Sequence, residues 1–182
     1  MSDAQLFAFE QDFVDSLRCI PMAVRIKLDL CGIKLTLRQW SRFTRDDRQG
    51  LLERSCIGAA EAASYAQALA ALVAARTHEV VRPLAEPPCR TWEHADEVPA
   101  AVANHARAAG LAAPSTRQWR GLTPLQRFAL VKLTRDNHDN VNFEPALREF
   151  GLVAPSDLGF CARGAQAQAF NGPPRPTARP RV

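Results

Sequence analysis

The sequence predicts an all-α protein: a compact helical domain built from two pseudo-repeats, followed by a disordered, flexible tail rich in Pro and Arg. One observation is an internal duplication, in which a proline, a glycine and an Arg-Gln-Trp triplet recur at an offset of 78 or 79 residues. A second is that no stretch of useful length alternates apolar and polar residues as a half-buried strand would. We expect the domain at 1–150, its copies at approximately 20–54 and 98–134, a connecting helix at 58–77, and the tail at 151–182.

The first copy predicts a long helix, a glycine turn, a short helix and a third helix. Pro21 suits the first turn of the long helix, where its missing N–H would be unpaired anyway. Gly32 stands where a left-handed C-terminal cap is needed. Thr36 is an N-cap candidate for a short helix that carries Trp40, and Thr44 is one for the next helix.

The second copy repeats the same helix signals at matching places. Pro99 suits a first helical turn, and Gly110 suits the left-handed cap that ends the helix. Ser115 is the N-cap candidate before Trp119, and Thr123 is the candidate before the third helix. The same order of helix starts and stops therefore occurs twice in the chain.

The remaining segments fit an all-helical chain. An apolar spacing of four predicts an amphipathic helix at 9–17, and an alanine-rich stretch with one apolar stripe predicts the helix at 58–77. Residues 80–97 hold three prolines and predict an irregular connection between the copies. A short last helix is expected at 144–150, ended by Gly151.

A unit of about 35 residues cannot bury enough apolar surface to be stable alone. We therefore expect the two copies to form one body, packed about an approximate two-fold together with the 58–77 helix. Trp40 and Trp119 hold corresponding places and are expected to be paired at the centre of that body.

The charge balance gives no strong nucleic-acid footprint. The formal net charge is +4, but the segment after Phe150 carries +3 of it, so residues 1–150 are close to neutral. No apolar run approaches the length of a membrane-spanning helix, and the N-terminus has no secretory pattern. We therefore expect a protein without a membrane association.

The cysteines predict a reducing, cytoplasmic location. Their number is odd, and the chain is large enough to build a core without disulfides. No two of them stand in a C-x-x-C spacing, and the four histidines form no H-x-x-x-H pair, so we expect neither a metal site nor a cofactor. The five residues are Cys19, Cys31, Cys56, Cys89 and Cys161.

No catalytic constellation is evident, so we expect the protein not to be an enzyme. Neither a glycine-rich dinucleotide loop nor a Walker A sequence occurs. Cys19 or Cys31 with His138 would supply a thiol and a base, but nothing in the sequence brings them together. Cys31 lies on the apolar stripe of its helix and is expected to be a small buried hydrophobe.

A run of basic and amide side chains after the first glycine turn is compatible with a helix-turn-helix DNA reader. Two aspartates interrupt the run, and the preceding turn is longer and more apolar than usual, so we expect a solvated basic face and nucleic-acid binding is not favoured. The residues are Arg38, Gln39, Arg42, Arg45 and Arg48, with Asp46 and Asp47 among them.

The two copies differ in charge at the start of their first helices. Arg25 and Lys27 of the first copy correspond to Ala103 and His105 of the second, so we expect that folding does not require the basic pair. A charge that folding does not require is available for docking another protein. The docking surface predicted on the first copy consists of Arg18, Cys19, Met22, Arg25 and Lys27.

Two blocks of the sequence together are similar to a known family. The opening block includes residues 7–10, 12–22, 24–29 and 31–35 with Trp40, and the closing block includes 122–130, 132–133, His138, 142–143, 145–147 and 149–150. Over approximately residues 7 to 150 the chain resembles the nitrate reductase-associated protein family.

The resemblance implies a small cytoplasmic bacterial protein, encoded near genes for assimilatory nitrate reductase and for molybdopterin synthesis. Such proteins are thought to be needed for an active reductase. The family has no established catalytic or cofactor residues, so none is transferred to this chain.

From the resemblance we expect a non-enzymatic accessory or maturation protein that binds assimilatory nitrate reductase. Two alternatives stay open at this point: a helix-turn-helix regulator of nitrogen genes, and a small thiol or metal protein of the molybdenum cofactor pathway. The sequence leaves the oligomeric state open.

Overall fold

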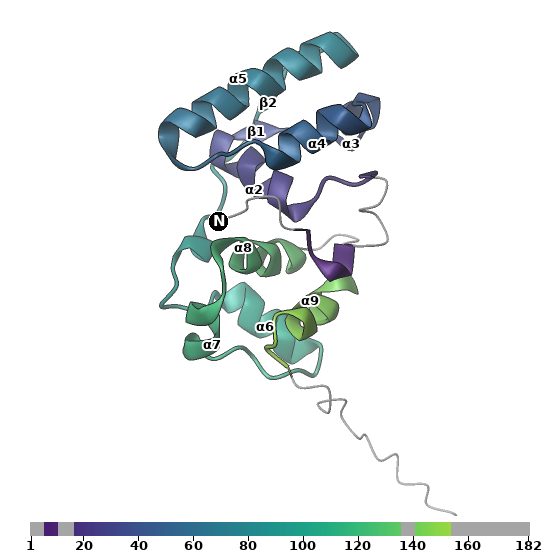
Figure 1. The fold of residues 1–182 in the computed structure, drawn as a ribbon. Coiled ribbons are helices and arrows are strands. Elements are labelled where there is room, and N and C mark those ends of the chain that lie inside the picture. The colour runs from purple at the N-terminus through teal and green to yellow at the C-terminus, as the bar shows by residue number, and fades with distance from the viewer. Residues whose placement is uncertain (1–5, 11–16, 136–140, 154–182) are drawn as a thin grey trace, which may run out of the picture.

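The computed structural model describes residues 6–10, 17–135 and 141–153. Within these ranges it contains eight α-helices, two short 3-10 helices and one two-stranded sheet, which confirms the all-α class (Figure 1). In the first half these are α2 (Met22–Cys31), α3 (Leu37–Arg42), α4 (Arg45–Glu53) and α5 (Gly58–Thr77). In the second half they are α6 (Ala100–Ala108), α7 (Thr116–Gly121), α8 (Pro124–Leu133) and α9 (Phe143–Glu149).

The predicted helix caps are present in both copies. At four helix starts the N-cap hydroxyl accepts a hydrogen bond from the N3 amide, and the N3 side chain accepts one from the N-cap amide. Gly32 and Gly110 adopt left-handed φ angles of 66° and 74° after α2 and α6. The capping pairs are Thr36 with Gln39, Thr44 with Asp47, Ser115 with Gln118, and Thr123 with Gln126.

The connection between the copies contains two short elements that the sequence did not predict. Strand β1 (Ile33–Lys34) pairs antiparallel with β2 (Arg82–Pro83), and the Leu84 amide donates to the Gly32 carbonyl over 2.8 Å. Further on, the 3-10 helix η2 (Thr91–Glu93) buries a tryptophan against α8. Two-residue strands are too short to leave an alternating pattern, and this pairing holds the chain after α5 beside the first copy.

The two tryptophans are not paired at the centre of one body, so that prediction is wrong. Among the described elements, helix α5 packs mainly against α2, α3 and α4, and the main contact between the halves runs from α2 to α8 (Figure 1). Trp40 and Trp119 lie in separate hydrophobic clusters, one in each half. Between the halves, Lys132 Nζ and Asp29 Oδ2 form an ion pair of 2.7 Å.

Each tryptophan is held in the same way within its own half. Trp40 Nε1 donates to the Leu17 carbonyl over 2.7 Å, and Trp119 Nε1 donates to the His94 carbonyl over 2.9 Å. Both rings are fully buried. The short helix of each copy is thereby fastened to the segment that precedes that copy, because a buried indole N–H requires an acceptor.

The ends of the described chain meet at α9. The Glu149 carboxylate accepts hydrogen bonds from the Ala8 and Phe9 amides of the 3-10 helix η1 (Ala8–Glu10), so this part of the expected 9–17 helix is not α-helical. Residues 11–16 of that expected helix lie outside the described residues.

Two residues that the sequence analysis assigned to the tail pack against the helical domain. Leu152 and Val153 are buried in the core of the second half, where α9 alone would leave apolar surface uncovered. The rest of the expected tail, 154–182, lies outside the described residues. Among the helices described, none combines the length and the apolar character needed to span a bilayer.

Candidate partner-binding surface

Two of the five residues predicted for docking are buried. Lys27 is 3% exposed and Met22 is 4% exposed, so neither offers its side chain to a partner. Lys27 Nζ donates to the carbonyls of Leu52 and Arg54 over 2.8 and 2.7 Å, and it thus satisfies acceptors at the C-terminal end of α4. These contacts favour a structural role for this lysine, which the sequence analysis did not predict.

The other three residues lie nearer the surface. Arg18 is exposed, and Cys19 and Arg25 are half-buried. Arg25 Nε donates to the Ile20 carbonyl over 2.9 Å, which fixes the guanidinium along the start of α2. A docking role for Arg18, Cys19 and Arg25 stays a prediction.

The basic run considered for DNA reading is divided by the fold. Gln39 is buried and bound within the protein, and Arg48 donates to the Trp40 and Leu17 carbonyls over 3.2 Å each. Neither side chain is placed to read a base edge. Arg38, Arg42 and Arg45 are exposed.

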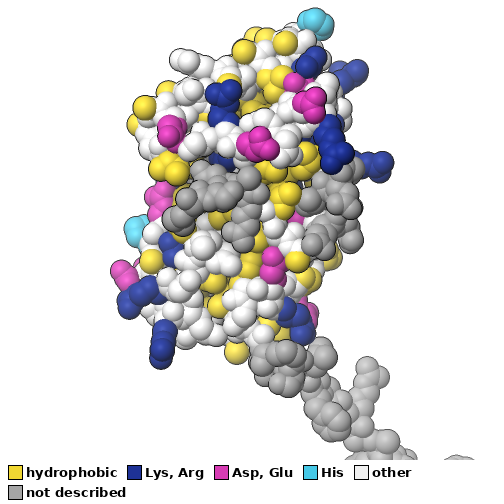
Figure 2. All heavy atoms as spheres, viewed as in Figure 1, with side chains coloured by type: hydrophobic (Ala, Val, Ile, Leu, Met, Phe, Trp, Pro, Cys, Tyr) yellow, Lys and Arg dark blue, Asp and Glu magenta, His cyan; other side chains and the backbone are white. Residues whose placement is uncertain are grey.

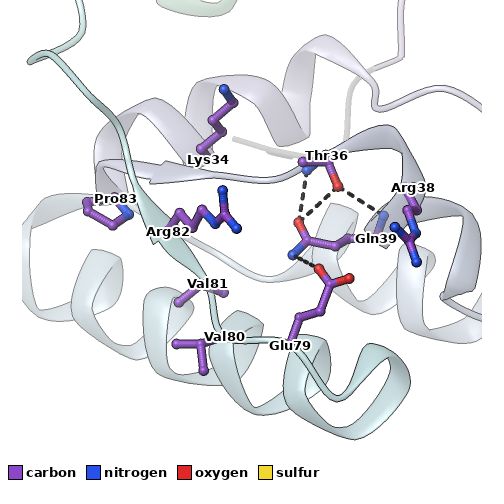
Figure 3. A pocket seen from close by; sticks show the side chains of 9 residues that line it. All are labelled: Lys34, Thr36, Arg38, Gln39, Glu79, Val80, Val81, Arg82 and Pro83. Atoms are coloured by element: carbon purple, nitrogen blue, oxygen red, sulfur yellow. Dashed lines mark hydrogen bonds between the residues drawn. The ribbon is translucent and has the colours of Figure 1, made fainter.

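A groove of about 660 Å³ lies between α3 and the chain that follows α5 (Figure 3). We name it the basic groove. The pairing of β1 with β2 forms it, because that pairing lays the segment after α5 alongside the start of α3. Its lining residues are Lys34, Thr36, Arg38, Gln39, Glu79, Val80, Val81, Arg82 and Pro83.

A hydrogen-bond chain fixes the floor of the basic groove. Gln39 Oε1 accepts from the Thr36 amide over 3.0 Å and from its hydroxyl over 3.2 Å. Gln39 Nε2 donates to Glu79 Oε2 over 2.9 Å, as Figure 3 shows. Gln39, the N3 residue of the α3 capping box, therefore also positions Glu79, the only acidic side chain among the lining residues, and holds its carboxylate against the wall of the groove.

The basic groove carries an excess of positive charge. Among the described residues, Lys34, Arg38 and Arg82 form no ion pair. An adjoining hollow of about 270 Å³ extends the basic lining to Arg42 and Arg76. Figure 2 shows several Lys and Arg side chains, with Asp and Glu side chains among them, at the edge of the molecule beside α3 and the C-terminal end of α5.

The second copy lacks most of this charge. Ala112 and Ala113 occupy the turn in which the first copy has Lys34, and Gly121 stands at the place of Arg42. Unlike Lys27, the two basic side chains at these places in the first copy are exposed, so the fold makes no visible use of their charge. The basic groove is therefore the surface on which the two copies differ most clearly in chemistry.

A second hollow, of about 490 Å³, lies beside the start of α6 and is lined by Cys89, Thr91 and His94 among others. The Thr91 hydroxyl, 3.5 Å from Cys89 Sγ, is the main cause that holds the pKa of this exposed thiol below its usual value. The hydrogen-bond partner described for this thiol is a hydroxyl, which is not a base and so assigns the thiol no reaction.

The Cys31 thiol of the first half has the opposite character. Cys31 Sγ and Cys56 Sγ are 3.7 Å apart, and burial, followed by the neighbouring thiol, raises the pKa of Cys31 to about 12. Cys31 is half-buried, less than the sequence predicted, and its Sγ also donates to the Ala62 carbonyl over 3.2 Å. His138, the base considered for it, lies outside the described residues.

Metal-ligating side chains do not gather in the part of the chain that is described: no three of its His, Cys, Asp and Glu residues are placed to share an ion. Sequence reasoning did not identify the basic groove, because the pairing that joins Lys34 and Arg82 is not predictable from local patterns.

Comparison with known proteins gives one match. No curated protein and no solved structure matches the chain. Residues 6–150, which include both copies, α5 and α9, match the family described as conserved nitrate reductase-associated protein. The match covers all but the last few described residues and confirms the resemblance seen in the opening and closing blocks, so the chain belongs to the nitrate reductase-associated protein family.

Proposed function

We propose that the protein is a non-enzymatic accessory protein of assimilatory nitrate reductase, which it binds and helps to reach its active state. The observation that carries this proposal is the family match over residues 6–150, because the family is described by its association with nitrate reductase.

The arrangement of reactive groups supports a binding role over catalysis. A catalytic thiol needs a lowered pKa and a base within hydrogen-bond reach. Burial raises the pKa of Cys31, and its polar neighbours are Cys56 Sγ and the Ala62 carbonyl, neither of which serves as a base. Cys89 has a lowered pKa, but its hydrogen-bond partner is a hydroxyl.

The protein acts in the cytoplasm in this proposal. Cys31 Sγ and Cys56 Sγ lie 3.7 Å apart as thiols, an arrangement that persists in a reducing compartment. The partner, the reductase, supplies the redox chemistry of nitrate reduction, and the accessory protein supplies a surface.

Deletion of the gene tests the proposal. In cells grown on nitrate, we expect reductase activity to fall while the amount of reductase protein, measured by immunoblot, stays at the wild-type level. Loss of the reductase protein together with its activity would refute the accessory role and favour a regulator of gene expression. Unchanged activity would refute any role in producing active reductase.

A further inference from the structure

We propose that the basic groove binds an acidic segment of a partner protein, with apolar side chains between its carboxylates. This proposal rests on the proposed function, because it takes the ligand to be a partner protein. It adds which surface binds that partner and which kind of segment is bound. The argument uses the charge of the groove, its apolar lining and the charge of the chain itself.

The first step is charge. Lys34 and Arg82 lie on the two paired strands, and Arg38 lies on α3, so three cations surround one opening (Figure 3). Glu79 opposes them, but its carboxylate is already bound by Gln39 Nε2 at 2.9 Å. A net positive opening of this kind attracts carboxylates and raises the rate at which an acidic partner associates.

The second step is the apolar lining. Val80, which lines the opening, is 82% exposed. Val81 and Pro83 add apolar surface to the wall. Exposed aliphatic side chains interleaved with cations match a peptide that alternates acidic and apolar residues, and a small oxyanion would leave them uncovered.

The third step concerns which ligand fits. The chain's own segment after Phe150 carries a net charge of +3, so like charges would repel it from this groove. Single-stranded nucleic acids bind grooves that pair cations with aromatic rings, and the residues lining the basic groove include no aromatic side chain. An acidic protein segment satisfies both the charge and the aliphatic lining.

The duplication supplies a matched control for the test. Arg38 and Arg117 occupy the same place in α3 and α7, both are exposed, and neither forms an ion pair with another described residue. Only Arg38 lines the basic groove. Arg38→Glu and Arg117→Glu therefore change the net charge equally and at equivalent positions, but only the first reverses a charge in the proposed site.

The binding test uses a fluorescein-labelled peptide of alternating glutamate and leucine, followed by fluorescence anisotropy with the full chain. We expect the wild type and Arg117→Glu to bind equally, and Arg38→Glu to bind about tenfold more weakly. A peptide with glutamine in place of glutamate should bind more weakly to the wild type. Arg82→Glu and Val80→Asp repeat the test on the other wall, and thermal melting verifies that each variant is folded.

Several outcomes would overturn the proposal. Equal binding of the glutamate and glutamine peptides, or no binding of either, would show that the groove does not recognise an acidic segment. Equal weakening by Arg38→Glu and Arg117→Glu shows an effect of net charge alone. Displacement of the peptide by inorganic phosphate at equal concentration assigns the groove to a small anion, and tighter binding of labelled oligo-dT assigns it to nucleic acid.

Capture of purified reductase separates this proposal from the proposed function. We expect the immobilised wild type and Arg117→Glu to capture the reductase and Arg38→Glu to lose most of that capture. If all three proteins capture the reductase equally, the basic groove is not the binding site, and the accessory function stands. If the wild type captures no reductase but binds the acidic peptide in the groove, the groove stands and its partner is a different acidic protein.

Discussion

Replacing Lys27 with methionine tests the reassignment of this residue from docking to folding. Lys27 is 3% exposed, and its ammonium donates to two carbonyls near the C-terminal end of α4, at 2.8 and 2.7 Å. It also lies over the Tyr65 ring, with Nζ at 5.9 Å from the ring centroid. Methionine has a similar length and no charge, so Lys27→Met removes the donors without opening a large cavity.

The expected loss follows from those contacts. A hydrogen bond from a charged donor contributes about 1.5–3 kcal/mol net, and two are removed here. Part of this is offset, because the variant no longer buries an ammonium group, whose desolvation costs several kcal/mol. We expect Lys27→Met to lower the free energy of unfolding by about 2–4 kcal/mol, which for a domain of this size lowers Tm by roughly 4–16 °C.

Urea and thermal denaturation followed by circular dichroism measure this loss. Lys34→Met is the matched control, because Lys34 is an exposed lysine without an ion pair among the described residues, and we expect its effect to stay within about 0.5 kcal/mol. If Lys27→Met is no less stable than Lys34→Met, the buried lysine does not hold α4 and the reasoning from its contacts is refuted.

Two further predictions concern titration and thiol reactivity. Hydrogen bonds from Arg76 are the main cause that holds the pKa of Asp47 below its usual value, so their contribution to stability is present above about pH 4 and is lost as the pH falls through the lowered pKa. We expect Asp47→Asn to lower Tm slightly at neutral pH and not at strongly acidic pH; a Tm difference that persists in acid would contradict this. In a Cys161→Ser background, we expect native labelling with iodoacetamide at neutral pH to modify Cys89 first and Cys31 only on unfolding, as mass spectrometry of peptides would show. Faster labelling of Cys31 than of Cys89 would contradict the burial argument.

The helix boundaries were predictable because their signals are local. The hydroxyl of Thr36 or Ser115 accepts a hydrogen bond from the amide three residues later, and Gly32 adopts a left-handed φ without steric strain. Neither interaction depends on what packs against the helix. The 58–77 helix was likewise predicted with its observed bounds. These interactions depend on sequence separations of a few residues.

The burial of Lys27 was not predicted, because the two copies fill the same place with different packing. His105 stands at the corresponding position, and its ring packs 4.5 Å from that of Phe143 on α9. Helices α4 and α5 pack against α2, which carries Lys27, whereas the ring of Phe143 on α9 packs against His105. A difference between copies therefore indicated different packing at this position, where we had inferred a residue that folding does not require.

The basic groove was hidden for a different reason. Gln39 and Glu79 are 40 residues apart and meet only because β1 and β2 pair. Two-residue strands produce no periodicity, and the length of α5 decides where the chain returns. The burial of Trp40 and Trp119 was predictable, but their separate clusters were not, because an apolar face does not specify what covers it.

Complementation of the deletion strain tests the central claim most directly, namely that the first copy offers a basic groove through which the protein supports nitrate reductase. Reductase activity per amount of reductase protein would be measured on nitrate with the wild type, Arg38→Glu or Arg117→Glu expressed to equal levels. We predict that the wild type and Arg117→Glu restore this activity and that Arg38→Glu does not. Full restoration by Arg38→Glu would contradict the claim.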